Sequence, residues 1–195
     1  RCWSEEVCTA LGIDMSMLGR VYESSEITGT VTKEMADELG LCEGTVVVGG
    51  AGDNAAAAIG TGVCEDGKAF TTIGTSGVVF AHTSDISIDP KGRVHTCCAA
   101  VPDSWHVMGV TQGAGLSLKW FRDNFCNAEK ETAKYMGVDE YYLMDKEAMT
   151  VPVGANRLLY LPYLMGERTP HLDPDARGVF FGLSAMHTKK DMLRA

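Results

Sequence analysis

The stretch VVVGGAGDNAAAAIG, residues 46–60, constrains the fold of this 195-residue chain more than any other. Its apolar start predicts a strand, its glycine cluster predicts a sharp turn, and its alanine-rich end predicts a short helix. Glycine lets the backbone turn tightly and leaves space beside it for a ligand. The strand, the glycine turn and the helix raise the question whether this turn is built to hold a phosphate or to present Asp53.

Gly50, Gly52 and Ala55 match G-x-G-x-x-A, a variant of the dinucleotide-binding fingerprint. Three features count against a dinucleotide site. Asp53 would repel a pyrophosphate, the helix is too short for the usual crossover of a βαβ unit, and no carboxylate ends the next strand to hold a ribose. Dinucleotide binding is therefore the weaker interpretation of this turn.

The other interpretation makes Asp53 itself the functional group. At a helix N-terminus, amide donors and the helix dipole favour a carboxylate anion. Such an anion can accept the proton of a hydroxyl group while that hydroxyl attacks a phosphoryl group. The structural alternative is that Asp53 only caps the helix.

Composition limits the partners that this chain can have. Its net charge of -9 disfavours a large nucleic-acid footprint and an anionic membrane surface. No apolar run approaches the ~20 residues that a membrane-spanning helix needs. Seven cysteines without a C-x-x-C pair indicate reduced thiols in a cytoplasmic protein rather than a disulfide framework or a zinc site.

Local signals predict alternating helices and strands. Caps, stops and apolar spacing indicate helices at 5–11, 33–39, 55–59, 113–125 and 131–149 and after Thr188. Extended runs indicate strands at 26–32, 45–50 (buried) and 156–164, and two hairpins at 68–83 and 93–110. We expect a long loop at 165–183 and a domain boundary in the polar, glycine-bearing break at 60–68.

Two further glycine turns are suited to bind phosphate. The run IGTSGVV offers backbone amides in a tight turn together with the hydroxyls of Thr75 and Ser76, although glycine and hydroxyl residues also build ordinary hairpin turns. The run VTQGAGLSLKW places Gly113 and Gly115 at a helix start, where a nucleotide can approach closely. Each turn alone is a weak signal, and the order of the three turns is the informative feature.

In that order the sequence resembles the FGGY family of carbohydrate kinases, most closely its xylulose-phosphorylating members. The matching runs are GAGDNAAAAIG, TIGTSGVV, GLSLKWFRD and YLPYLMGERTPHLDPDARGVFFGL, and together they extend over nearly the whole chain. The last run is long and highly specific, and the Asp-Asn pair at 53–54 is typical of xylulose kinases, whereas glycerol kinases tend to carry Asp-Gln.

The resemblance implies an α/β, actin-like ATPase fold of two ribonuclease-H-like domains with a cleft between them. Residues 1–66 would end the sugar-binding domain and residues 67–195 would begin the nucleotide-binding domain. Asp53 would be the catalytic base, with Asn54 beside it at the sugar. The nucleotide phosphates would contact the second phosphate loop, Gly74, Thr75, Ser76 and Gly77, and also Gly113. ATP and Mg²⁺ would be the cofactors, with no metal ligand from this chain, and family members are often cytoplasmic homodimers.

The implied reaction converts D-xylulose and ATP into D-xylulose 5-phosphate and ADP. The alternatives are a kinase of another sugar or polyol, an actin-like ATPase in which water attacks, and a non-enzymatic actin-like domain that binds nucleotide. The family's D-x-G-T phosphate loop and its glycine-rich adenosine motif do not occur in these 195 residues. We therefore expect the 195 residues to be a central piece of a longer enzyme and to be inactive alone.

Glu167, Arg168 and His171 occupy the most specific matching run. They either contribute to a site at the domain cleft or form an internal Glu–Arg pair within a loop shaped by two prolines. His171 and Asp173 are too few to indicate a metal site. We interpret His82, His95 and His106 as structural or exposed, and Trp105 and Trp120 as packing residues.

Overall fold

The computed structural model of the chain describes residues 2–195. The chain divides into two compact units. Unit 1 consists of residues up to 70 together with 80–87 and 96–107, and unit 2 consists of 71–79, 88–95 and 108–195. Among the described residues, no helix has both the length and the apolar character needed to cross a membrane. All seven cysteines are free thiols.

Unit 1 starts with two short helices whose ends lie where the sequence predicts them. These are α1 (Glu5–Leu11) and α2 (Lys33–Leu39), with a 3-10 turn, η1 (Met15–Met17), after the first. The hydroxyls of Ser4 and Thr32 each accept an amide hydrogen from the first turn of their helix, at 3.2 and 3.3 Å. Gly12 and Gly40 end the helices in the left-handed conformation that glycine adopts without strain. Both caps and both stops are confirmed.

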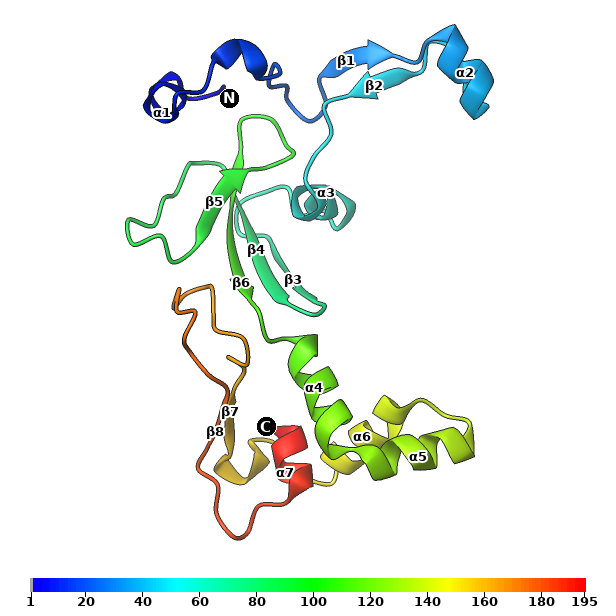
Figure 1. Cartoon of the computed structure of the whole chain (residues 1–195), viewed down its shortest axis with the longest axis vertical. Helices are drawn as coiled ribbons and strands as arrows, with labels where there is room; N and C mark the ends of the chain where they lie inside the picture. Colours follow the sequence, from blue (N-terminus) through cyan, green and yellow to red (C-terminus); the bar gives the residue numbers. More distant parts are fainter. Residues whose placement is uncertain (1) are drawn as a thin grey trace. The chain divides into compact units, whose positions relative to one another are not determined.

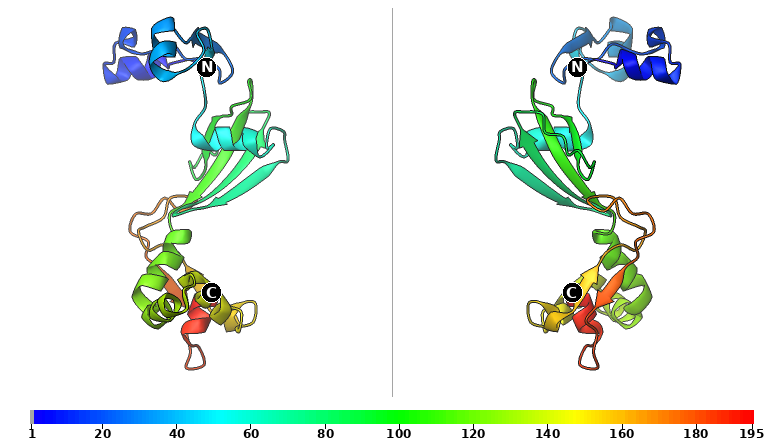
Figure 2. Two further views of the ribbon diagram at one scale, coloured as in Figure 1. Left: turned by 90° about the vertical axis from the view of Figure 1, so that its right-hand side faces the viewer. Right: turned by 90° about the vertical axis from the view of Figure 1, so that its left-hand side faces the viewer.

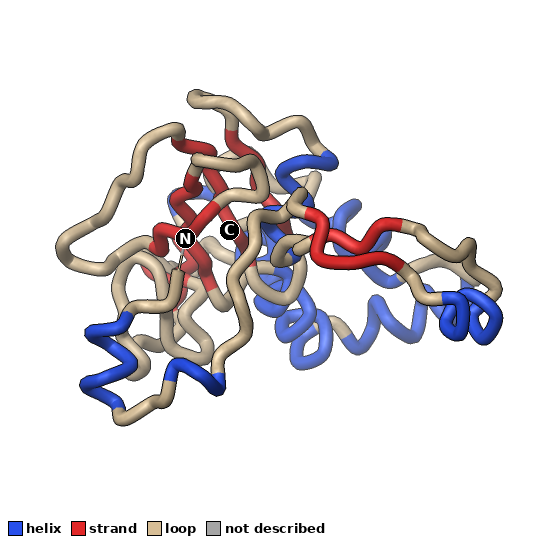
Figure 3. Tube along the Cα trace, turned by 90° about the horizontal axis from the view of Figure 1, so that it is seen from above, coloured by secondary structure: helices blue, strands red, loops and turns tan. Residues whose placement is uncertain are grey.

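The segments before and after α2 pair as a two-stranded antiparallel ribbon. Its strands are β1 (Ile27–Thr30) and β2 (Val46–Val48), and α2 lies on the connection between them (Figure 3). The sequence predicts β2 as a buried strand, and this is wrong in one respect. The three valines are 56, 46 and 46% exposed. A two-stranded ribbon has two open faces, so an apolar run predicts the strand here but not its burial.

The central sheet consists of β3 (Ala69–Ile73), β4 (Gly77–Thr83), β5 (His95–Cys98) and β6 (Trp105–Thr111), in the order β3-β4-β6-β5 (Figure 1). Each predicted hairpin is therefore a pair of neighbouring strands. The predicted helix that follows β2 is α3 (Asp53–Gly60), longer at both ends than the sequence indicates and visible beside β3 and β4 in Figure 2. The helix packs through Ala58 against Phe80, Phe70 and Val63, which form the core of unit 1.

Two of the three strand histidines belong to this core. His82 and His106 are buried, and the His106 ring stacks on Phe80 with ring centroids 4.3 Å apart. Burial lowers the pKa of His106, because a buried imidazolium loses its hydration. The interpretation of these two histidines as structural residues agrees with their placement.

Unit 2 contains the remaining helices. They are α4 (Gly115–Phe125), α5 (Asn127–Met136), α6 (Glu140–Ala148) and α7 (Lys189–Arg194), with a 3-10 turn, η2 (Ala155–Arg157), before the strand β7 (Leu159–Leu161). Their core consists of Phe121, Cys126 and Met144, against which Trp120, Tyr141, Phe180, Met192 and Leu193 pack. The predicted run 131–149 is thus the end of α5 and all of α6.

The expected loop at 165–183 contains a strand that the sequence analysis missed. Residues Val179–Phe181 form β8, antiparallel to β7 (Figure 1). The Phe180 ring lies 4.7 Å from the Tyr160 ring, centroid to centroid. Cross-strand aromatic pairs of this kind stabilise short ribbons. The apolar run of β8 is only three residues long and follows a segment rich in prolines and charges, so the sequence pattern indicates a loop.

The last helix is anchored by a buried carboxylate. Asp191 Oδ2 accepts hydrogen bonds from the backbone N–H and the hydroxyl of Thr188, both at 2.7 Å, and its Oδ1 accepts from Asn156 Nδ2 at 2.8 Å. These donors, chiefly the Thr188 backbone and then its hydroxyl, lower the pKa of Asp191 to about 2. Thr188 is therefore the helix start that the sequence predicts.

The Asp191 network predicts how stability depends on pH. An unfolded aspartate has a pKa of about 3.9, so the anion's contribution is fully present above that value and is lost as pH falls toward 2. D191N is expected to lower the free energy of unfolding at pH 7 and to reduce its fall between pH 4 and 2, measured by urea unfolding. D145N changes an exposed aspartate on α6 and serves as the control. Equal pH profiles for wild type and D191N would contradict this account.

Candidate active site

Asp53 is the first residue of α3, and Gly52 occupies the cap position with an extended backbone. The Asp53 side chain is exposed. Its Oδ1 accepts from the backbone N–H of Asn54 at 2.8 Å and lies 3.5 Å from Asn54 Nδ2. Its Oδ2 makes no hydrogen bond within residues 2–195. Asp53 is thus not the cap of α3, and it presents one carboxylate oxygen to solvent.

Gly49 and Gly50, which precede Asp53, are required by the path of the backbone. A Cβ on Gly49 would lie 2.4 Å from the Glu23 carbonyl oxygen, and Gly50 has a φ of 75°. The amides of these two glycines donate to Glu26 O at 3.0 Å and to Ser24 O at 2.9 Å. Since both amides bond to protein carbonyls, they are not available to a pyrophosphate. The dinucleotide alternative thus loses the Gly50 amide as a donor.

Residues 74–77, which we call the GTSG turn, join β3 to β4. The amide of Gly74 donates to Ser76 O at 2.9 Å and closes the turn. Thr75 and Ser76 are exposed, and neither hydroxyl bonds to another described residue. Gly77 is buried, and a Cβ there would lie 3.0 Å from Thr111 Cγ2. The turn therefore has an open hydroxyl side and a packed glycine side.

The start of α4 is bonded to this turn. The amides of Gly115 and Leu116 donate to Gly74 O at 2.8 Å and to Thr75 O at 3.1 Å. A Cβ on Gly115 would lie only 2.5 Å from Gly74 O. These two amides thus bind backbone carbonyls of the turn, and the helix start holds the GTSG turn in place.

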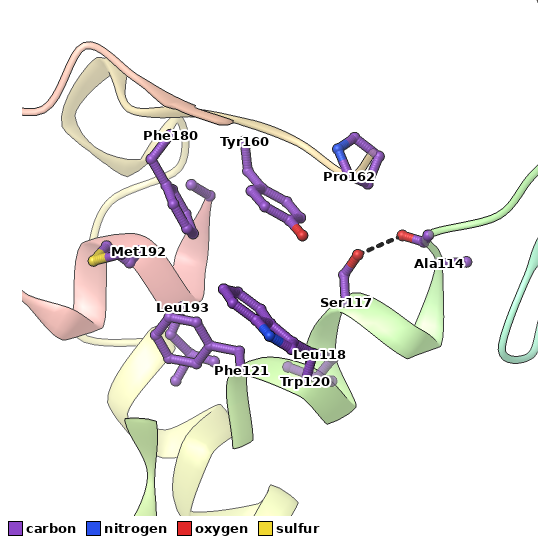
Figure 4. Close-up of a pocket in the computed structure, with 12 residues that line it drawn as sticks. Ala114, Ser117, Leu118, Trp120, Phe121, Tyr160, Pro162, Phe180, Met192 and Leu193 are labelled. Carbon is purple, nitrogen blue, oxygen red and sulfur yellow. Dashed lines mark hydrogen bonds between the residues drawn. The ribbon is translucent and has the colours of Figure 1, made fainter. Parts of the chain in front are cut away.

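Gly113 is buried, and a Cβ on it would lie 2.0 Å from the Pro162 carbonyl oxygen. Its carbonyl accepts from the Ser117 hydroxyl at 2.6 Å. On one side Gly113 borders a cavity of about 250 Å³ (Figure 4). The other lining residues come from α4, β7, β8 and the region of α7: Ala114, Ser117, Leu118, Trp120, Phe121, Tyr160, Pro162, Phe180, Met192, Leu193 and Ala195. A nucleotide contact at Gly113 stays a prediction.

The side chain of Glu167 is buried, at 4% exposure. Its Oε2 accepts from the Thr111 hydroxyl at 2.6 Å, and its Oε1 accepts from the backbone amides of Arg168 at 2.7 Å and Gln112 at 3.1 Å. The Arg168 guanidinium lies 3.3 Å from His95 Nε2 instead. Of the two alternatives for these residues, the internal Glu–Arg ion pair is wrong, because Glu167 contacts the backbone amide of Arg168 and not its guanidinium.

The other residues of this loop form separate contacts. The Tyr163 hydroxyl lies 3.0 Å from His171 Nε2, and the carbonyl oxygens and amides of Glu167 and Asp173 bond reciprocally at 2.8 and 3.0 Å. Within residues 2–195, no group of three or more His, Cys, Asp or Glu side chains is arranged to hold a metal ion.

Comparison with protein families decides the assignment. The family model for the FGGY carbohydrate kinases matches with its C-terminal domain at residues 69–195 and with its N-terminal domain at residues 1–60. The chain belongs to the FGGY family of carbohydrate kinases. Its mixed α/β structure matches solved members of this family along 98% of the chain, as in the ligand-bound xylulose kinase from Lactobacillus acidophilus, with a TM-score of 0.85 at 27% identity.

Two relatives with different substrate names are similarly close in sequence. The xylulose kinase of Bacillus subtilis is 39% identical over 99% of this chain, and the gluconokinase of the same organism is 37% identical over 99% of it. The chain spans about 37% of the length of each, and also 37% of the Lactobacillus xylulose kinase chain. The FGGY assignment is therefore firm, whereas the sugar is not given by these relatives.

The glycine packing in this FGGY chain predicts a strong effect of one methyl group. G113A places a Cβ 2.0 Å from a backbone oxygen that cannot rotate away, so the strand after η2 or the start of α4 must shift. We expect a loss of about 1–3 kcal/mol in the free energy of unfolding, measured by denaturant titration. G60A at the end of α3 meets nothing within 4 Å and is the control. Equal stability of the two variants would refute the packing argument.

Proposed function

We propose that a full-length protein carrying these residues transfers the γ-phosphoryl group of ATP to a ketopentose, with D-xylulose as the preferred substrate and D-xylulose 5-phosphate as the product. The observation that carries the proposal is the geometry of Asp53, which is exposed, starts α3 and has an unbonded Oδ2. Membership of the FGGY family supplies the reaction class.

In the proposed reaction, Asp53 Oδ2 accepts the proton of the sugar hydroxyl as its oxygen bonds to the γ-phosphorus and the bond to the β–γ bridging oxygen breaks. The backbone N–H of Asn54 donates to Asp53 Oδ1 and so holds the carboxylate in place, while Oδ2 has no hydrogen-bond partner among the described residues. ADP leaves with the electron pair of the broken bond. Each step uses groups that this chain supplies or that the two substrates bring.

The GTSG turn contributes donors to the phosphates. The exposed hydroxyls of Thr75 and Ser76 and the neighbouring amides can surround a phosphoryl oxygen cluster as a nest. Mg²⁺ in such reactions is bound mainly by phosphates and one or two carboxylates, and when bound it neutralises the charge on the β- and γ-phosphates.

Removal of the proposed base tests the mechanism. In the full-length protein, D53N is expected to lower kcat by roughly 10²–10⁴-fold, because the amide cannot accept the hydroxyl proton. ATP affinity should stay the same, since Asp53 does not contact the phosphates in this mechanism. The matched control is D37N on α2, an exposed aspartate without a hydrogen bond to the rest of the described chain. Near-normal turnover of D53N in a steady-state assay would rule out the proposed role.

The substrate is tested with a panel of D-xylulose, ribulose, gluconate and glycerol. We expect kcat/KM to be highest for D-xylulose, in line with the Asp-Asn pair at 53–54 and with the name of the Bacillus subtilis relative at 39% identity. Gluconate as the best substrate would favour the second relative's activity instead. ATP hydrolysis that no sugar accelerates would identify an actin-like ATPase, and ATP binding without turnover a non-enzymatic domain.

A further inference from the structure

Glu167 is a buried carboxylate that the proposed reaction does not use. Its two oxygens receive three hydrogen bonds, from one hydroxyl and two backbone amides, and no cation lies in ion-pair contact with it among the described residues. Burying a carboxylate without a cation is costly, and hydrogen bonds from several donors offset part of this cost. The role of this carboxylate is therefore inferred from the segments that its three donors belong to.

Two of the donors belong to the end of β6, at Thr111 and Gln112. Glu167 lies 55 and 56 positions further along the chain, so it joins the signature loop to the segment that leads into α4. The third donor, the Arg168 amide, fixes the loop's own backbone beside the carboxylate. The carboxylate thus holds the carboxyl end of β6 against the loop.

Thr111 connects this carboxylate directly to the GTSG turn. Its hydroxyl donates to Glu167 Oε2, which selects one rotamer of the side chain. In that rotamer its Cγ2 occupies the space beside Gly77, 3.0 Å from where a Cβ would stand. One side chain therefore contacts Glu167 with its oxygen and the packed side of the GTSG turn with its methyl group.

Gln112 provides a second connection through the backbone. Its amide is fixed by Glu167 Oε1, and three residues later the Gly115 amide donates to Gly74 O at 2.8 Å. The segment between them is confined by the contact of Gly113 with Pro162. A shift of the β6 end would therefore move the donors that hold Gly74 and Thr75.

We propose that Glu167 is a positioning residue for nucleotide binding, which fixes the GTSG turn through the Thr111 side chain and the Gln112 backbone. The inference rests on the proposed function in one respect, namely that the GTSG turn binds ATP phosphates. Glu167 itself touches no substrate in this scheme. Its effect is on the geometry of the turn, so its loss should weaken nucleotide binding selectively.

The test measures the Kd of a non-hydrolysable ATP analogue by calorimetry in the full-length protein, with the Tm recorded in parallel. In E167Q the amide oxygen retains the two backbone donors, so the amide nitrogen faces Thr111 and the charge-assisted bond is lost. T111V removes the same bond from the other side while keeping the methyl group at Gly77. Each is expected to raise the Kd roughly fivefold, about 1 kcal/mol.

The double variant E167Q/T111V separates positioning from general damage. If the two substitutions remove the same hydrogen bond, their effects should not add, and the double variant should show a Kd raised roughly fivefold rather than ~25-fold. KM for ATP should rise in parallel while KM for the sugar changes less than about twofold. E131Q on α5 replaces an exposed glutamate in the same unit and should leave all values unchanged.

The outcomes are distinct. A lowered Tm with unchanged analogue Kd in E167Q and T111V would overturn the inference and leave Glu167 a purely structural residue. Equal increases in the Kd for analogue and the KM for sugar would also overturn it. If the wild type binds the analogue but phosphorylates no sugar, the proposed reaction fails and the Kd comparison still decides the inference. No analogue binding by the wild type would refute both.

Discussion

The two backbone hydrogen bonds from the start of α4 to the GTSG turn are the contact on which the arrangement of this part of unit 2 depends. They connect a hairpin turn at 74–77 to a helix that begins at Gly115, through Gly74 O and Thr75 O. The approach is so close that a side chain on Gly115 would lie 2.5 Å from Gly74 O. Position 115 therefore requires glycine for a packing reason, because a Cβ there would clash with the carbonyl oxygen that accepts the Gly115 amide hydrogen bond.

That contact changes what the glycine runs mean. Glycine at a helix start is commonly interpreted as room for a phosphate, because helix amides bind anions. Here the amides of Gly115 and Leu116 are bonded to protein carbonyls, and those of Gly49 and Gly50 are bonded to the segment 24–26. The side-chain groups left open are the hydroxyls of Thr75 and Ser76 and one oxygen of Asp53.

Much of this structure could be predicted because its signals are local. The caps at Ser4, Thr32 and Thr188 and the hairpins at 68–83 and 93–110 depend on signals from nearby residues, and the structure confirms each of them. The sequence could not predict the exposure of β2, since an apolar run looks the same whether or not another layer covers it. It missed β8 because three residues carry too short a period to stand out from a proline-rich loop.

The partners of Glu167 show a different limit. In the sequence its nearest opposite charge is the adjacent Arg168, so an ion pair is the natural expectation, yet adjacent side chains of an extended segment point to opposite sides. Two of its three actual donors, the Thr111 hydroxyl and the Gln112 amide, are 56 and 55 residues away and uncharged, and the third is the backbone amide of Arg168. A carboxylate that meets only amides and a hydroxyl has no charge pattern by which a sequence could reveal it.

Asp53 and Glu167 use the same chemical group in opposite ways. In Asp53 a single amide holds one oxygen and leaves the other exposed, which is the arrangement that proton transfer to a substrate requires. In Glu167 both oxygens are occupied by donors and the side chain is buried, so it can neither reach a substrate nor exchange its partners without moving the backbone. The proposed base needs exposure and a free oxygen, and Glu167 has neither; exposed acids such as Asp37 and Asp145 have both, so it is the place of Asp53 at the start of α3, after the glycine turn, that sets it apart.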